Sequence, residues 1–312
     1  MMRTNRGVAL ISILMVVVLF SALAFQLYSH QTMVTAQTRV GLTANQARHS
    51  LMASEALAQE LLYQDWIDED GRVRDDMVEP WAQSLLPINT VSGSVRVQIV
   101  DLSGRLNLNS LVSESSEVST SAFSYILNRI GISVELTPVW RDWIDADDQR
   151  FFVEGYQGRE ELDWLSNATP FRTPNRLAGH LSELKILAPF ASDVYTELTH
   201  LVTVLPTRTL KVNVNTAHPE VLNSLLPPTS SKMSSRAGVR NFGSVEAFID
   251  LNNDFSAVID HLSVRSDFFE VRATLEGADL RMDMTSQIYR DPRSGECRVY
   301  ARDFATRHVW ST

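Results

Sequence analysis

The stretch that decides the fold is residues 6–65, RGVALISILMVVVLFSALAFQLYSHQTMVTAQTRVGLTANQARHSLMASEALAQELLYQD. It contains no proline, and its only glycine after the second residue is Gly41. From Gly7 to Thr38 there is no Asp, Glu, Lys or Arg. As a helix, the twenty residues from Val8 to Leu27 would span about 30 Å, the hydrocarbon thickness of a bilayer. The stretch therefore predicts a helix that can cross a membrane once.

The helical pattern continues beyond the apolar run. Apolar residues recur at three- and four-residue steps or their sum, which is typical of a helix with one buried face: Val40, Ala44, Ala47, Leu51, Ala58 and Leu61. The pattern ends near Asp65. At 1.5 Å per residue, a helix from Val8 to this point would be roughly 85 Å long. We expect a spine that is apolar first and amphipathic after.

The charges around the apolar run predict its orientation. Arg3 and Arg6 precede it, so the positive-inside rule leaves the short leader in the cytoplasm and sends the remainder outward. Two other interpretations remain open. The small-residue pattern Ala22-Leu23-Ala24 could be cut as an ordinary signal peptide, leaving a soluble periplasmic binding module, or the helix could stay as an uncut anchor.

Composition excludes several classes of function. The formal net charge of −9 over 312 residues argues against a nucleic-acid partner, which requires a basic surface. Cys297 is the only cysteine, so neither an intramolecular disulfide nor a thiolate zinc site can form. There is no HExxH, GxSxG or P-loop motif. We therefore expect a protein that is not an enzyme.

The outward part of the chain predicts an α+β organisation. Val95, Val97 and Ile99 alternate with polar residues, as in a half-buried strand. Helical signals dominate from Leu111 to Leu205, and strand alternation returns in a meander from Phe269 to Ala301. The sequence therefore predicts a sheet whose strands are interrupted by a helical insertion.

A run of acidic residues is a candidate metal site. It contains hard oxygen ligands of the kind that calcium requires: Asp145, Asp147, Asp148, Glu160, Glu161 and Asp163. It is not an EF-hand, since Tyr156 occupies the position of the twelfth-position Glu. A solvated acidic loop remains the alternative, with its charge offset by Arg141, Arg150 and Arg159.

Five segments together resemble one protein family. Arg6-Gly7 followed by Val8-Ala9-Leu10-Ile11 resembles the leader of type IV pilins and pseudopilins. Ser12 stands where most pilins carry Glu, a departure that resembles the K-type minor pseudopilins of bacterial type II secretion systems. Four further segments are similar to that family in the same order: residues 104–109 (GRLNLN), 142–148 (DWIDADD), 171–176 (FRTPNR) and 212–217 (VNVNTA).

The resemblance implies a fold and its divisions. The fold would be a pilin-like long N-terminal helix packed on an antiparallel sheet, with an inserted all-helical domain of the sterile-alpha-motif-like type. The divisions would be a leader (1–7), a spine helix (8–65), a pilin-like α/β domain (66–110 and 206–312, with a short helical segment at 216–265) and the insertion (111–205). Prepilin peptidase would cut between Gly7 and Val8.

The resemblance also implies a role. The protein would be a single-pass inner-membrane subunit with its C-terminal domain in the periplasm. It would sit at the tip of the pseudopilus, initiate or cap assembly, and help to export folded periplasmic proteins across the outer membrane. Its partners would be the I-type and J-type minor pseudopilins, prepilin peptidase, the inner-membrane secretion platform and secreted proteins, with calcium bound in the acidic run and no nucleic acid.

Overall fold

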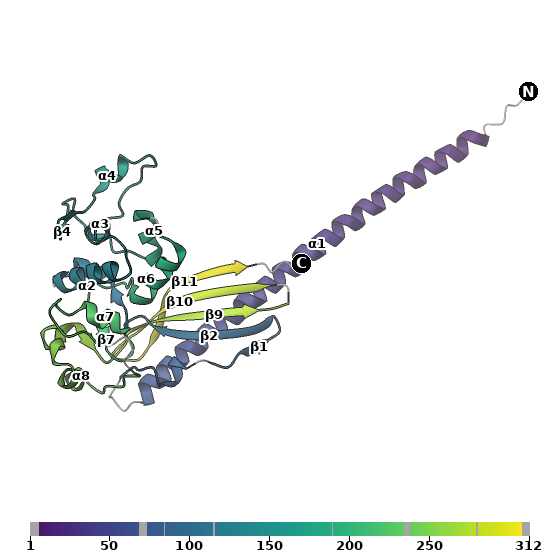
Figure 1. Ribbon diagram of the computed structural model, residues 1–312. Coiled ribbons are helices and arrows are strands. Elements are labelled where there is room, and N and C mark those ends of the chain that lie inside the picture. The colour runs from purple at the N-terminus through teal and green to yellow at the C-terminus, as the bar shows by residue number, and fades with distance from the viewer. Residues whose placement is uncertain are drawn as a thin grey trace, which may run out of the picture.

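A computed structural model describes residues 6–68, 74–83, 85–114, 116–188, 190–233, 238–278 and 280–307. It consists of a long helical rod, a sheet against the end of that rod, and a mostly helical head beyond the sheet (Figure 1).

Helix α1 (Arg6–Asp68) confirms the predicted spine and extends it slightly at both ends. Its N-terminal half projects away from the rest of the molecule (Figure 1), and residues 9–42 are exposed there. Within the described residues, this is the one helix long and apolar enough to cross a membrane, judged by length and composition. Its C-terminal half buries one stripe against the sheet, because the apolar residues recur at helical spacing: Ala47, Leu51, Ala58 and Leu62.

The main sheet has five antiparallel strands in the order β1-β2-β9-β10-β11. Their bounds are β1 (Ile88–Thr90), β2 (Gly93–Asp101), β9 (Phe268–Glu276), β10 (Arg281–Arg290) and β11 (Cys297–Arg307). Residues buried at alternate positions form one core with the buried stripe of α1. In β11 the register shifts between the pairs Gln287–Ala301 and Ile288–Val299, which leaves Tyr300 as an extra residue.

The head contains seven helices among the described residues. They are α2 (Ser116–Arg129), α3 (Leu136–Ile144), α4 (Glu161–Leu165), α5 (Leu184–Leu187), α6 (Ser192–Leu201), α7 (Pro219–Ser224) and α8 (Val245–Leu251). Short 3-10 turns accompany them as η2 (Leu108–Val112), η3 (Leu181–Glu183) and η4 (Asn253–His261), and η1 (Pro80–Ala82) lies beside α1. Two short parallel pairs join β3 (Leu106–Asn107) to β6 (Val202–Thr203), and β7 (Val212–Asn213) to β8 (Leu262–Ser263).

The predicted insertion is mostly rather than wholly helical. Strands β4 (Phe152–Val153) and β5 (Tyr156–Gln157) form a small antiparallel hairpin between α3 and α4. Its turn residues Glu154 and Gly155 both have positive φ, at 51° and 82°, which suits a two-residue hairpin turn. Strands of two residues are too short for alternation to reveal in a sequence. The likeness to a sterile-alpha-motif domain stays a prediction.

The helices of the insertion share their core with later residues. One hydrophobic cluster runs from Leu106 to Leu262 and includes Leu222 and Phe248, well beyond position 205. The predicted domain limits stay a prediction, but the head's core is built from residues on both sides of the predicted boundary at 205.

Candidate functional site: an acidic cluster in the head

Helix α3 positions the acidic run. Trp140 and Trp143 are buried on its inner face, and this packing fixes the orientation of the helix on the head's core. Asp145 lies at the C-cap, where its backbone N–H donates to Arg141 O at 3.0 Å. The chain then leaves the helix through Asp147, which is exposed.

Three carboxylates come together after this turn. One oxygen from each of Asp145, Asp147 and Glu160 lies within 4.8 Å of the other two. Glu160 comes from the start of α4, after the β4–β5 hairpin, and only 6% of it is exposed. The hairpin thus reverses the chain and brings Glu160 back to the end of α3.

A fourth carboxylate, Asp142 of α3, contacts both ends of the β4–β5 hairpin. It is fully buried, and its Oδ1 accepts a hydrogen bond from Phe151 N at 3.0 Å. A Cβ on Gly158 would collide with Oδ2 of Asp142 and with the carbonyl of Pro138. The hairpin can therefore lie this close to α3 only with glycine at that position.

Four of the buried oxygens of these acidic side chains lack a hydrogen-bond partner. Among the buried side-chain atoms described, no partner is found for Asp142 Oδ2, Asp145 Oδ1 or either carboxylate oxygen of Glu160. Buried polar atoms are almost always hydrogen-bonded, so these four oxygens are open to a ligand.

The three arginines expected to offset the charge of the acidic run form no ion pair with Asp145, Asp147 or Glu160, although Arg150 does offset Asp163. Arg150 pairs with Asp163 at 2.6 Å, and Arg159 pairs with Glu135 at 3.1 Å. Arg141 lies over the ring of Phe151, with 3.7 Å between Cζ and the ring centroid. In the described part of the chain, no cation is within ion-pair distance of the three clustered carboxylates.

The pKa values reflect the burial of these carboxylates, which outweighs the opposing charge of Arg141. Burial is the main cause that raises the pKa of Asp142 to about 7 and that of Asp145 to about 6. Burial also raises the pKa of Glu160 to about 7, and the charge of Asp142 adds to that effect. Each carboxylate disfavours ionisation of the others, as expected for like charges that share a site.

The geometry fits a hard divalent cation. Calcium binds six to eight oxygens at about 2.3–2.6 Å, so two oxygens on opposite sides of the ion can be about 5 Å apart. Oxygens within 4.8 Å of one another can therefore all reach one ion. An all-oxygen set of carboxylates in an irregular loop suits calcium better than zinc, which prefers nitrogen and sulfur.

The remaining predicted site residues lie apart from this group. Glu161 is 3.7 Å from Arg172, and Asp163 is occupied by Arg150 and by the backbone N–H of Glu160. Asp148 lies in the same loop and is exposed. Sequence reasoning did not single out Asp142, although a carboxylate three positions before Asp145 on the buried face of α3 was a usable signal. Calcium ligation by any of these residues stays a prediction.

The leader residues lie at the far end of α1. Gly7 and Val8 form part of its first turns, and Ser12 is exposed on the same helix. Their predicted roles in processing and assembly stay predictions.

The known proteins that this chain resembles share one name, and the similarity extends over nearly the whole chain. The profile described as Type II secretion system (T2SS), protein K matches residues 104–207. Type II secretion system protein K of Pseudomonas aeruginosa is 30% identical over 97% of this chain and 94% of that protein. The protein of the same name from Klebsiella pneumoniae is 25% identical, covering 93% and 94% respectively.

A solved structure shares the fold. One chain of the crystal structure of the GspK-GspI-GspJ complex, from the type 2 secretion system of enterotoxigenic Escherichia coli, superposes with a TM-score of 0.74. It is 20% identical in sequence, and the match covers 86% of this chain and 99% of that one.

Proposed function

The chain belongs to the type II secretion system protein K family, and we propose that it is a minor pseudopilin that works by assembly rather than by catalysis. The observation that carries this proposal is the projecting half of α1 (Figure 1). Its apolar side chains at positions 10–34 are exposed, with no contact to the sheet or head. Such a surface needs a bilayer or neighbouring helices to cover it.

We place the chain in the inner membrane with its sheet and head in the periplasm. The arginines before the apolar run hold the leader in the cytoplasm by the positive-inside rule. Prepilin peptidase would then cut between Gly7 and Val8 on the cytoplasmic side. The inner-membrane secretion platform would receive the processed subunit.

The proposed partners are the I-type and J-type minor pseudopilins. The support is the shared fold with a chain whose complex contains GspI and GspJ. Ser12 favours a position at the pseudopilus tip, because an entering pilin uses a Glu there to pair with the amine of the subunit above it. A subunit with nothing above it needs no such charge. From the tip it would initiate or cap assembly, contact secreted proteins and help them across the outer membrane.

Co-assembly tests this proposal directly. The chain from Ser29 onward is mixed with the periplasmic domains of the I-type and J-type subunits, and the products are weighed by native mass spectrometry. We expect a complex that contains all three chains. A chain that stays alone at concentrations where the other two associate would contradict the assignment.

We also propose that the head binds calcium through Asp145, Asp147 and Glu160, with Asp142 beneath them. The support is the set of unsatisfied buried oxygens and the absence of a paired cation among the described residues. The ion would offset the repulsion among these carboxylates and fasten α4 to the end of α3.

A further inference from the structure

Two cavities lie between the sheet and helix α6 of the head, and Arg105 lines both of them. The larger, of about 650 Å³, is bounded by Val100 of β2 and His200 of α6 among others. The smaller, of about 470 Å³, is bounded by Glu270 of β9 and Thr199 of α6 among others. Volumes of about 300–1,000 Å³ are typical of ligand pockets. The two cavities, with Arg105 between them, are termed the sheet–head cleft.

Arg105 belongs to the segment 104–109, in which every other residue has a structural role. The two leucines of the segment are buried in the core of the head. Its two asparagines are buried, and their side chains hydrogen-bond to backbone groups between residues 178 and 209. A Cβ on Gly104 would collide with the hydroxyl of Thr216, so only glycine allows this close packing. Folding thus accounts for the whole segment except the side chain of Arg105.

The backbone is held on both sides of Arg105. Its N–H donates to Leu102 O at 3.2 Å and closes a turn. The next residue, Leu106, begins β3 and pairs with Val202 of β6. The guanidinium therefore enters the cleft from a fixed backbone, and such preorganisation lowers the entropy cost of binding a ligand.

The guanidinium of Arg105 has neither a hydrogen bond nor an ion pair within the part of the chain that the structure describes. The carboxylates whose charge acts on it are Glu270 and Asp101, and both are bound by other groups. Glu270 Oε1 accepts from Arg272 Nε at 2.5 Å, and Asp101 Oδ2 accepts from Ser266 Oγ at 2.6 Å. Burial lowers the pKa of Arg105, because the attraction of these two carboxylates does not offset it.

The other charged groups that line the cleft do not neutralise Arg105. Glu197 and Asp303 are exposed, and neither is within ion-pair distance of Arg105. Two further arginines line the cleft but pair with other carboxylates: Arg129 with Glu220 at 3.4 Å, and Arg302 with Glu55 at 2.6 Å.

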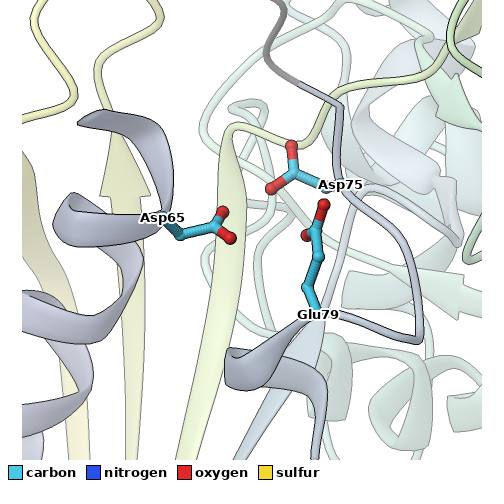
Figure 2. Close-up of side chains that lie close together, drawn as sticks. All are labelled: Asp65, Asp75 and Glu79. Atoms are coloured by element: carbon cyan, nitrogen blue, oxygen red, sulfur yellow. The ribbon is translucent and has the colours of Figure 1, made fainter. Parts of the chain in front are cut away.

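Arg290, at the end of β10, shows how the same molecule accommodates another buried guanidinium. It is 2% exposed, lies 3.2 Å from Asp65 and binds Asp75. Figure 2 shows these two carboxylates and that of Glu79 pointing toward one another at the end of α1. The fold thus brings carboxylates to Arg290, whereas it leaves Arg105 facing the two cavities.

We propose that the sheet–head cleft binds a ligand through a single carboxylate group, which pairs with Arg105. The planar guanidinium can donate two parallel hydrogen bonds to the two oxygens of a carboxylate. One unpaired guanidinium balances one negative charge, and the nearby Glu270 and Asp101 would repel a second. A carboxylate therefore fits the cleft better than a doubly charged phosphate. Its source is either an acidic side chain of a peptide or a small organic acid, and the site does not depend on the pseudopilin role.

Chemical modification of arginines, followed residue by residue, tests this site. Phenylglyoxal forms adducts with guanidinium groups, and mass spectrometry of peptides from the full-length chain in detergent micelles reports each arginine separately. At constant ionic strength, acetate at concentration c should slow the modification of Arg105 by a factor of 1 + c/Kd, about tenfold at a ninefold excess over Kd. Arg96 of β2, which lies outside the cleft and pairs with Glu276, should keep its rate.

Three further probes identify the ligand class. They are a capped peptide of alanines with one aspartate, the same peptide with asparagine instead, and inorganic phosphate. Protection of Arg105 by the aspartate peptide at lower concentrations than acetate would identify a peptide as the source, and the reverse order would identify a small organic acid. The asparagine peptide should give no protection. Stronger protection by phosphate than by acetate would refute a carboxylate site.

The variant R105Q separates binding from a structural role. The substitution breaks no described hydrogen bond or ion pair of the side chain, so R105Q should be at least as stable as the wild type in chloride. Acetate at the same ionic strength should raise the Tm of the wild type and of the control R96Q, but not that of R105Q. Equal effects of acetate on all three proteins, or modification of Arg105 at the same rate with and without acetate, would overturn the proposal.

Discussion

At the residue scale, the acidic cluster of the head shows that neighbouring carboxylates can have different surroundings. Glu160 and Glu161 are adjacent, yet Glu160 belongs to the acidic cluster of the head and Glu161 faces Arg172. The difference arises because residue 160 precedes α4 and faces inward, whereas residue 161 begins the helix. Adjacent residues therefore make a matched pair for testing the calcium site.

We predict that Glu160→Gln lowers calcium affinity strongly and Glu161→Gln only slightly, as measured by isothermal titration calorimetry. The amide retains the shape of the side chain but removes one charged ligand. In the wild type, calcium should add about 2.7 kcal/mol to the free energy of unfolding at a hundredfold excess over Kd. Equal losses in both variants, or no calcium binding by the wild type, would contradict the proposed site.

The same site predicts a pH dependence. Burial raises the pKa values of Asp142, Asp145 and Glu160, so the folded state holds more protons than the unfolded state. Their contribution to stability is therefore lost as pH rises from about 4 through about 7. Calcium needs the ionised forms, so its stabilising effect should grow over the same range.

A buried ion pair offers a second test at this scale. Glu55 of α1 is 5% exposed and accepts from Arg302 of β11 at both oxygens, at 2.8 and 2.6 Å. Removing one partner of a buried pair costs about 3–5 kcal/mol, and the partial exposure of Arg302 places Arg302→Ala at the lower end. Arg298→Ala is the control, since it breaks an exposed pair with Glu296 worth at most about 1 kcal/mol. Chemical denaturation of both variants checks the difference, and equal stability would contradict it.

How much the sequence reveals at this scale depends on whether partners are local. The acidic residues lie close together in the sequence, between positions 145 and 163, so Asp145, Asp147 and Glu160 could be singled out with their neighbours. Asp65 and Arg290, in contrast, are separated by 225 positions and meet only through the fold. Charge pattern alone gives no indication of such a contact.

At the element scale, the long helix was the most predictable part. Its apolar run and the stripe at helical spacing extend over more than ten turns, and α1 follows them. The strands of the meander were likewise visible, because apolar and polar residues alternate through much of β9 and β10, which are nine and ten residues long. The β4–β5 hairpin was not, since tertiary packing over Asp142 rather than local pattern holds it in place.

The first residues of α1 predict where the mature chain begins. We expect the mature chain to begin at Val8, because a charged leader precedes an unbroken helix. Mass spectrometry of the protein purified from cells that contain prepilin peptidase measures this directly. The same cells without the peptidase provide the control and should yield an unprocessed chain. A mature chain that begins at Phe25 would instead indicate an ordinary signal peptide and a soluble product.

At the scale of the whole molecule, the head is large relative to the rod that carries it. Even the roughly ninety residues of the predicted insertion, if compact, would have a radius of gyration near 12 Å, and the core of the head extends beyond them. Repeated along a shaft, such heads would crowd one another. We predict one copy of this chain per complex with the I-type and J-type domains, measured by native mass spectrometry. Two or more copies would argue against a place at the tip.

The two cores explain why the overall division was harder to predict than its parts. Sheet and rod share one hydrophobic cluster, and the head has another that draws on residues from 106 to 262. Strand and helix patterns mark individual elements. Whether the segment after residue 205 packs in the core of the sheet or in that of the head depends on contacts between distant residues, such as Val212 beside Leu262.

The extra residue in β11 changes which residues of the C-terminal strand face the rod, much as a frameshift changes which codons are read. Before Tyr300, Cys297 and Val299 face the rod, and after it Arg302 and Phe304 do. If Tyr300 were instead paired with Gln287 in unbroken register, the same sequence would present its later residues on the opposite faces. Ala301 would then lie opposite Ser286, Arg302 would point away from Glu55, and the ion pair that closes the sheet onto its helix would be lost.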